Sequence, residues 1–224
     1  TLGRLVFWYG LLSLLAMSGY LLYVRFQAPQ LIVPASAVEF IKKEQLKGNM
    51  YNEFGVGGYL LYHLYPEKKV FFDGRADIYF CCEIPDDFML NNVNIPPDAY
   101  KKIVDDFVAK YDMSIVLIGT NKEITRRHVA EVLSKEPAWH LVYWDDLYTI
   151  FARDGSGNDD VIARWGAVAA TPLEEAPSRR GAFVLAKTEY ERMIGFVDSA
   201  TSRNALATFA YLSGDTKTAK EEFM

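Results

Sequence analysis

The chain has 224 residues, 50% of them hydrophobic, and its formal net charge is −5 at pH 7. This length is enough for one domain with additional elements, and the apolar fraction is large enough for a buried core. The mildly acidic balance argues against a nucleic-acid-binding protein, because such a protein carries a basic surface. The chain begins at Thr1 and ends inside a predicted helix, so we expect a fragment of a longer protein.

Residues 5–24, "LVFWYGLLSLLAMSGYLLYV", contain no charged side chain and are bracketed by Arg4 and Arg25. About 20 apolar residues in a helix span the hydrocarbon core of a bilayer. We therefore expect a transmembrane helix within residues 1–28, followed by a proline-containing linker at 29–35. A signal peptide is the alternative, but its small-residue cleavage site would lie earlier. One arginine on each side leaves the orientation open.

The next region, residues 36–154, alternates between helical and strand patterns. Helices are expected at 37–46, 57–65, 96–112 and 125–136, and strands at 49–54, 69–75, 113–120, 139–146 and 147–153. The helix at 57–65 is apolar nearly all round and is expected to be buried. This order predicts a three-layer α/β domain with a mostly parallel sheet whose first three strands are parallel. The last two strands would form an antiparallel hairpin around Asp145 and Asp146.

The rest of the chain has two parts. Residues 155–180 contain glycine, proline and charged residues, which predict a flexible linker. Residues 181–224 are predicted to be helical, as the start of tetratricopeptide (TPR) repeats or as a plain helical hairpin. The TPR-like spacing is carried by Leu206, Ala207, Gly214, Ala219 and Phe223.

Glycines follow the first predicted strand, at Gly55, Gly57 and Gly58. Glycines between a strand and a helix are typical of a dinucleotide-binding loop, but Leu60 stands where the third glycine of that motif belongs. The alternative is steric, because glycine allows a tight turn and close packing of the helix on a strand.

Asp73 and Arg75 lie at the end of the predicted strand 69–75, and Asp77 follows. A carboxylate beside a guanidinium recognises sugar hydroxyls or a phosphate, and the end of a strand is where open α/β sheets bind ligands. The same residues also make an internal ion pair that holds a turn. The three histidines are scattered, so we expect no metal site, no catalytic triad and no cofactor in this fragment.

One longer stretch, "NEFGVGGYLLYHLYPEKKVFFDGRADIY", together with "YDMSIVLIGT" and "EPAWHLVYWDDLYTIFAR", resembles part of the family 39 glycosyltransferases, the dolichyl-phosphate-mannose-protein mannosyltransferase-like group of the GT-C fold. The resemblance covers about residues 5–154. It is carried most specifically by Asn52, Phe54, Gly57, Gly58, Tyr59, Asp73, Gly74, Arg75 and Asp77.

The resemblance implies the last membrane helix and the extracytoplasmic α/β domain of a polytopic protein in a bacterial inner membrane. The parent would use a polyprenyl-phosphate-sugar donor, and its catalytic carboxylate would lie upstream, so no catalytic residue is expected here. The domain would have an accessory or acceptor-binding role, with Asn52, Gly57, Gly58, Asp73, Arg75 and Asp77 as candidate ligand contacts. The alternative is a non-enzymatic, membrane-anchored module whose helical tail binds a protein partner.

Overall fold

The computed structural model describes residues 33–79, 95–120, 124–170 and 183–223, together with positions 8, 13–14, 17–20, 86, 90 and 172. Contacts divide the chain into two units, Thr1–Ile32 and Val33–Met224. In the first unit the described residues are helical. No helix among the described residues is long and apolar enough to cross a membrane, so the structure does not support the predicted membrane helix. Most of that segment, residues 5–24, lies outside the described residues.

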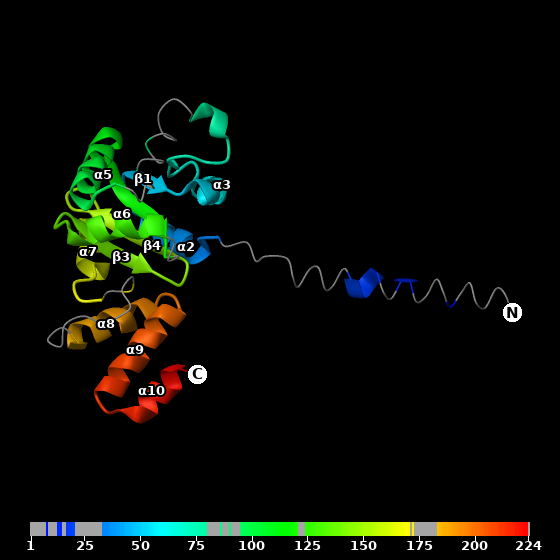
Figure 1. The fold of residues 1–224 in the computed structure, drawn as a ribbon, viewed down its shortest axis with the longest axis vertical. Helices are drawn as coiled ribbons and strands as arrows, with labels where there is room; N and C mark the ends of the chain where they lie inside the picture. The colour runs from blue at the N-terminus through cyan, green and yellow to red at the C-terminus, as the bar shows by residue number, and fades with distance from the viewer. Residues whose placement is uncertain are drawn as a thin grey trace. The chain divides into compact units, whose positions relative to one another are not determined.

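The second unit is a mixed α/β structure built on a four-stranded sheet, with strand order β1-β2-β4-β3 (Figure 1). The strands are β1 (Asn49–Asn52), β2 (Met113–Gly119), β3 (Trp139–Trp144) and β4 (Tyr148–Arg153). β1 pairs in parallel with β2, whereas β4 is antiparallel to both β2 and β3. The predicted hairpin is therefore confirmed. The predicted mostly parallel sheet is wrong, because only one of the three pairings is parallel.

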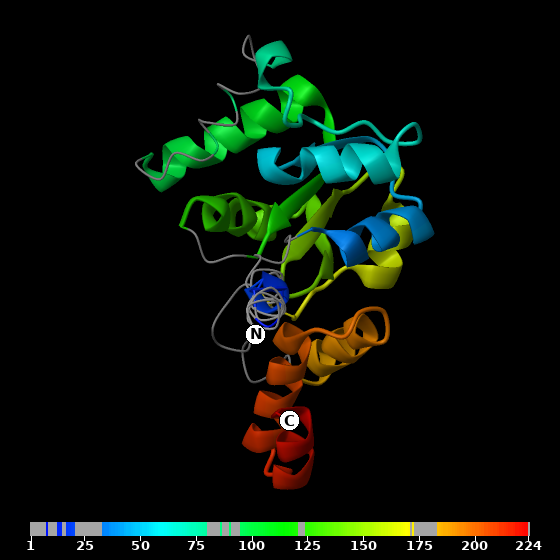
Figure 2. The same cartoon turned by 90° about the vertical axis from the view of Figure 1, so that its right-hand side faces the viewer.

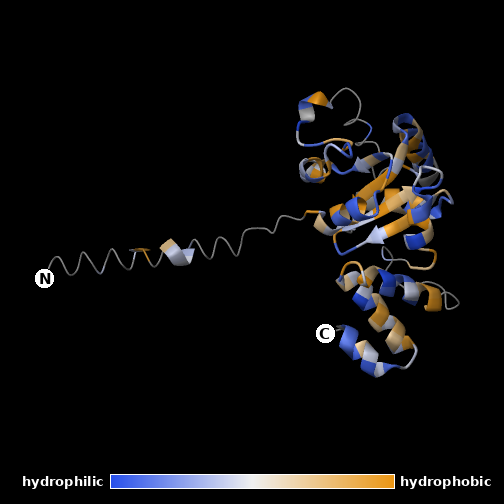
Figure 3. Ribbon diagram, turned by 180° about the vertical axis from the view of Figure 1, so that it is seen from behind, coloured by the Kyte–Doolittle hydropathy of each residue, from blue (hydrophilic) through white to orange (hydrophobic). Residues whose placement is uncertain are grey.

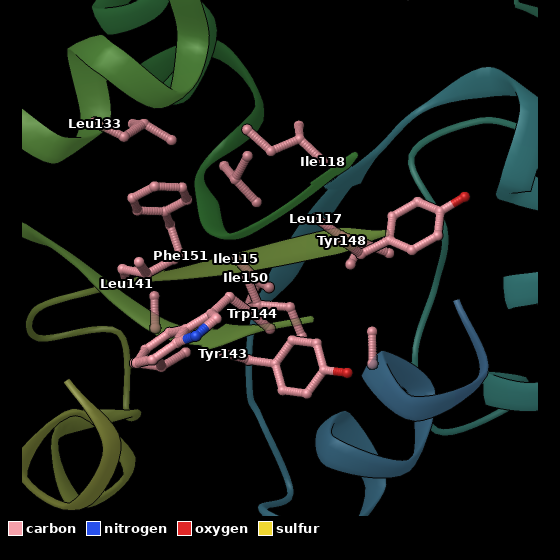
Figure 4. Packing of buried hydrophobic residues seen from close by; sticks show 14 of the residues in the cluster. Ile115, Leu117, Ile118, Leu133, Leu141, Tyr143, Trp144, Tyr148, Ile150 and Phe151 are labelled. Atoms are coloured by element: carbon pink, nitrogen blue, oxygen red, sulfur yellow. The ribbon is translucent and has the colours of Figure 1, made fainter. Parts of the chain in front are cut away.

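Helices cover both faces of this sheet (Figure 2). Helices α5 (Pro97–Tyr111) and α6 (Ile124–Lys135) pack against β2, and α6 also contacts β3. Helices α2 (Ala35–Lys43) and α7 (Asp159–Trp165) pack against β3 from the opposite side. In Figure 4, Leu133 of α6 lies near Ile118 and Phe151, whereas Tyr143 points the other way. Hydrophobic residues are concentrated in the sheet, with hydrophilic ones on the outer helix faces (Figure 3).

The predicted strand at 69–75 is not a strand, and the expectation of three parallel strands fails with it. Its backbone is bound instead by a side chain at the end of β1. The Phe71 amide donates to Asn52 Oδ1 at 2.8 Å, and Asn52 Nδ2 donates to the Phe72 carbonyl oxygen at 2.9 Å. The side-chain amide of Asn52 thus makes two hydrogen bonds to this segment, where a strand would pair with a neighbouring strand through its backbone. The apolar run that predicted a strand is explained by burial, since Phe72 is 1% exposed.

Helix α3 (Gly57–Leu64) follows the short 3₁₀ helix η1 (Phe54–Val56). We expected it to be buried all round, and this is wrong. Gly57, Leu60 and Leu64 are buried, but Tyr62 on the other face is 83% exposed. The helix packs against α2.

Helix α7 lies inside the stretch 155–180 that we expected to be a flexible linker. Its Trp165 ring lies 5.4 Å from Phe40 of α2, in an edge-to-face arrangement. Just before the helix, Asn158 Oδ1 accepts from the Lys47 amide at 2.7 Å and Asn158 Nδ2 donates to the Lys47 carbonyl oxygen at 3.1 Å. These contacts fix the first part of that stretch to the sheet unit. Residues 171 and 173–182 lie outside the described residues.

Three helices follow, namely α8 (Phe183–Ile194), α9 (Ala200–Leu212) and α10 (Thr216–Phe223). α9 and α10 form a hairpin in which Ala207 and Ala219 are buried, at 0% and 4% exposure. Gly214, in the turn between them, has a φ of 84°, which favours glycine. The predicted helical tail is therefore present as one antiparallel pair preceded by α8.

The tail is attached to the sheet unit by polar contacts from the β3–β4 turn. Asp146 accepts from the amides of Ala200 and Thr201, at 2.9 and 2.8 Å, and so caps the start of α9. Beside it, Trp144 Nε1 donates to Ser202 Oγ at 3.0 Å in a buried contact. The turn that closes the hairpin thus also orients the tail.

We expect Asp146→Ala to lower the free energy of unfolding by about 1 kcal/mol, because the amides of Ala200 and Thr201 lose their acceptor while the N-cap Ser199 still accepts from Ser202. Asp146→Asn keeps a side-chain oxygen and serves as the matched control, with most of the stability retained. Urea denaturation measures both. Equal stability of the alanine variant and the wild type would show that the cap contributes nothing.

Candidate functional site

The candidate ligand residues converge where residues 72–75 meet the start of α3. A Cβ atom on Gly57 would lie 2.0 Å from the Phe72 carbonyl oxygen and 2.7 Å from Asp73 Cα. Only a residue without a side chain allows this approach, so the steric interpretation of Gly57 is confirmed. A Cβ atom on Gly58 would meet nothing within 4 Å, and Gly58 is exposed. The two adjacent glycines therefore have different roles.

Asn52 lies underneath this contact and is 0% exposed. Both polar atoms of its side-chain amide bind backbone groups, with Nδ2 also donating to the Glu53 carbonyl oxygen at 3.0 Å. A buried amide without such partners would be strongly unfavourable. The structure therefore assigns Asn52 to support the segment that carries Asp73, and not to contact a ligand.

The Asp73 carboxylate is paired with Arg75 through two parallel hydrogen bonds. Arg75 Nε donates to Oδ1 at 2.9 Å and Nη2 donates to Oδ2 at 2.6 Å. The Arg75 backbone amide donates to Oδ1 at 2.9 Å, and the Tyr79 hydroxyl donates to Oδ2 at 3.3 Å. With its side chain 3% exposed, Asp73 is fully occupied within the protein and orients Arg75.

Each member of the pair stabilises the charged form of the other. The hydrogen bonds from the Arg75 side chain are the main cause that lowers the pKa of Asp73 to about 2. The same bonds raise the pKa of Arg75 above its usual value. Burial, followed by the Asp73 charge, raises the pKa of the Tyr79 hydroxyl, which therefore stays a donor at neutral pH. The pair is a fixed carboxylate–guanidinium unit over the physiological pH range.

Arg75 is the member of the pair that faces solvent, with its side chain 63% exposed. The Asp73 carboxylate uses Nε and Nη2 of Arg75 and leaves the two N–H donors of Nη1 outside the pair. A guanidinium held by two hydrogen bonds loses little conformational entropy when it binds an anion. The arrangement is therefore suited to bind a phosphate or a carboxylate.

The remaining two candidates take no part in these contacts. Asp77 is exposed on the 3₁₀ helix η2 (Ala76–Ile78), outside the hydrogen bonds of the pair. Gly58 is exposed and makes no close approach. The structure thus brings together Asn52, Gly57, Asp73 and Arg75 but not these two. No group of side chains in the described part of the chain could hold a metal ion.

Sequence reasoning missed two residues near this site. Tyr79 donates a hydrogen bond to Asp73 in addition to those from Arg75. Glu53 links the ends of the parallel strands β1 and β2. Glu53 Oε1 accepts from the Gly119 amide at 2.9 Å, and Glu53 is only 8% exposed. Glu53 lies inside the strand predicted at 49–54, and only the observed end of β1 at Asn52 places it at the edge where open sheets bind ligands. No signal in the sequence indicates Tyr79 either.

We expect Gly57→Ala to lower the free energy of unfolding by about 1–3 kcal/mol, because its methyl group overlaps backbone atoms of residues 72 and 73. The matched control is Gly58→Ala in the same helical turn, which should raise it by about 0.5–1 kcal/mol. Chemical denaturation of both variants measures the difference. Equal effects of the two substitutions would contradict the close approach at Gly57.

The pair should also leave a signature in the pH dependence of stability. The pKa of Asp73, about 2 in the folded state, lies below that of an unfolded aspartate, about 3.9. The contribution of the pair is therefore present above pH ~4 and is lost as the pH falls toward ~2. We expect the difference in unfolding free energy between wild type and Asp73→Asn to shrink over this range. Denaturant titrations at a series of pH values test this, and a constant difference would contradict it.

No family model, curated protein or solved structure matches this chain. The resemblance to family 39 glycosyltransferases therefore stays a hypothesis.

Proposed function

We propose that the α/β unit is an accessory, ligand-binding part of a membrane glycosyltransferase-like protein that uses a polyprenyl-phosphate-sugar donor. In this proposal Arg75 contacts the phosphate of the donor or an anionic group of the glycan acceptor. The predicted membrane helix at 1–28 would anchor the unit, and the unit would lie outside the cytoplasm of a bacterium. No residue of this fragment is assigned a catalytic role.

The observation that carries the proposal is the way in which Arg75 is held. Asp73 accepts from Nε and Nη2, while 63% of the Arg75 side chain is exposed. The guanidinium is thus fixed by the carboxylate on one edge and open to solvent. The planar guanidinium group matches the geometry of a phosphate, and Asp73 holds that plane in one orientation.

Asp73 has a positioning role in this proposal. Its carboxylate is 3% exposed and does not reach a ligand, but it fixes the plane of the guanidinium through two hydrogen bonds. Gly57 and Asn52 in turn fix the backbone of residues 71–73. Asn52 and Gly57 thus hold the segment that carries Asp73, and Asp73 holds Arg75. In this proposal only Arg75 touches the ligand.

The second candidate is a non-enzymatic module that binds a protein partner through its helical tail. The observation that favours it is the α9–α10 hairpin, whose Tyr211 and Leu212 are 67% and 57% exposed. Small buried residues at the helix contact, such as Ala207 and Ala219, are typical of TPR repeats. In this alternative the Asp73–Arg75 pair has only a structural role.

We expect the full chain in detergent to bind a short-chain polyprenyl phosphate, and Arg75→Gln to weaken that binding about 10–100-fold. The basis is the loss of charge-assisted hydrogen bonds worth roughly 1.5–3 kcal/mol. Isothermal titration calorimetry measures the dissociation constants. Lys69→Gln, which removes another exposed cation six positions earlier, is the matched control and should leave the affinity nearly unchanged.

Absence of binding by the wild type, or an equal loss in both variants, would contradict the proposal. Unchanged binding by Arg75→Gln together with capture of a peptide partner by the tail would favour the second candidate. Thermal unfolding of each variant checks the fold. Lys69→Gln should unfold like the wild type because its side chain is exposed, whereas Arg75→Gln should lower the melting temperature because the buried Asp73 carboxylate loses its partner, so binding is compared at a temperature where both variants are folded.

A further inference from the structure

A row of aromatic side chains is exposed along η1 and α3. Phe54, Tyr62 and Tyr65 are 40%, 83% and 66% exposed, and the exposed Gly58 lies between them in the sequence. Spacings of four and three residues place Gly58, Tyr62 and the cap residue Tyr65 on one side of α3, and Phe54 precedes them in the 3₁₀ helix η1. We call Phe54, Gly58, Tyr62 and Tyr65 the α3 ridge. Figure 2 shows α3 at the surface of the unit.

The ridge has a fixed place relative to Arg75. The opposite side of α3 is buried through Leu60 and Leu64, at 0% and 3% exposure. The first turn of the helix touches residues 72 and 73 at Gly57, and η1 contacts the same segment through the Phe54 and Phe72 rings, 5.5 Å apart. The start of the ridge, at Phe54 and Gly58, therefore lies next to the segment that carries Arg75.

The shape and chemistry of the ridge favour a lipid surface over a soluble sugar. Sites for small ligands are concave and bury most of the ligand, whereas a side chain that is 83% exposed protrudes. Tyrosine prefers the boundary between hydrocarbon and water, where its ring is apolar and its hydroxyl remains hydrated. From Phe54 to Tyr65 the ridge is about 16 Å long at the rise of a helix, enough to lie along a bilayer surface.

The connection to the predicted membrane helix supports the same occupant. Helix α2 is the first element of the unit, and α3 packs against it. The linker predicted at 29–35 joins the predicted membrane segment to this unit, and its seven residues span about 25 Å at most when extended. Such a short connection would keep the unit at high effective concentration next to a bilayer.

We propose that the α3 ridge inserts into the headgroup layer of the membrane and holds Arg75 at the depth of lipid phosphates. The inference rests on the proposed function in one respect, because a polyprenyl phosphate would present its phosphate to Arg75 at this depth. Around the ridge the cations Lys69 and Arg75 are balanced by the exposed Glu67 and Asp77. The attraction therefore comes from the aromatic rings, and the contact should need neither anionic lipid nor low salt.

The test places a fluorescent reporter on the ridge of the full chain reconstituted into phosphatidylcholine vesicles. In Tyr62→Trp the added tryptophan should emit at shorter wavelength than in water and lose emission when the vesicles contain phosphatidylcholine brominated on its acyl chains. Tyr211→Trp, at a position on α9 that is 67% exposed, is the matched control and should emit as in water. The wild type gives the background of the native tryptophans.

Quenching at position 62 that does not exceed quenching at position 211 would overturn the inference, and so would a chain that does not float with the vesicles. Loss of the position-62 signal in high salt would also overturn it, since the contact would then be electrostatic. Binding of a short-chain polyprenyl phosphate in detergent reports on Arg75 without any membrane. The vesicle experiment therefore tests the membrane contact of the α3 ridge, and the detergent experiment separately tests the proposed function of Arg75.

Discussion

The buried side chain of Asn52 holds in place the segment on which the candidate site depends. Its amide binds the backbone on both sides of the Phe71–Phe72 peptide, although this segment has no strand partner among the described residues. Gly57 allows the start of α3 to reach the same backbone. Asp73 follows directly and uses both carboxylate oxygens to orient Arg75. An apolar residue at position 52 would leave buried backbone groups unpaired, and the orientation of Arg75 would be lost with them.

A few side-chain hydrogen bonds likewise orient the helical tail. The β3–β4 turn closes the hairpin, and one of its residues, Asp146, caps a helix that starts 54 residues later. Trp144 extends from the same hairpin to Ser202. Glu189 of α8 accepts hydrogen bonds from the amides of Val168, Ala169 and Ala170, so the chain that enters the tail is held as well. α8 and α9 are therefore part of the compact second unit, which extends from Val33 to Met224.

Periodicity in the sequence predicts the elements whose burial is regular. β2, with all seven residues buried, and the long helix α5 are examples. It fails where a side chain replaces backbone pairing, as Asn52 does, because an apolar run looks the same in both cases. Periodicity also fails for α3, because the exposed Tyr62 counts as an apolar residue in the sequence pattern. For the candidate site, the pairing of Asp73 with Arg75 follows from their spacing, but the burial of one partner and the exposure of the other depend on contacts distant in sequence.

The central claim is that Arg75 is held rigidly and still binds an anion, and the NMR signal of its side-chain Nε–H group tests both parts. The account predicts a slowly exchanging Nε–H, because Asp73 accepts from it at 2.9 Å. Addition of a short-chain polyprenyl phosphate should shift this signal while the Nε–H stays protected. A rapidly exchanging Nε–H at the position of free arginine, unchanged by the ligand, would contradict the account.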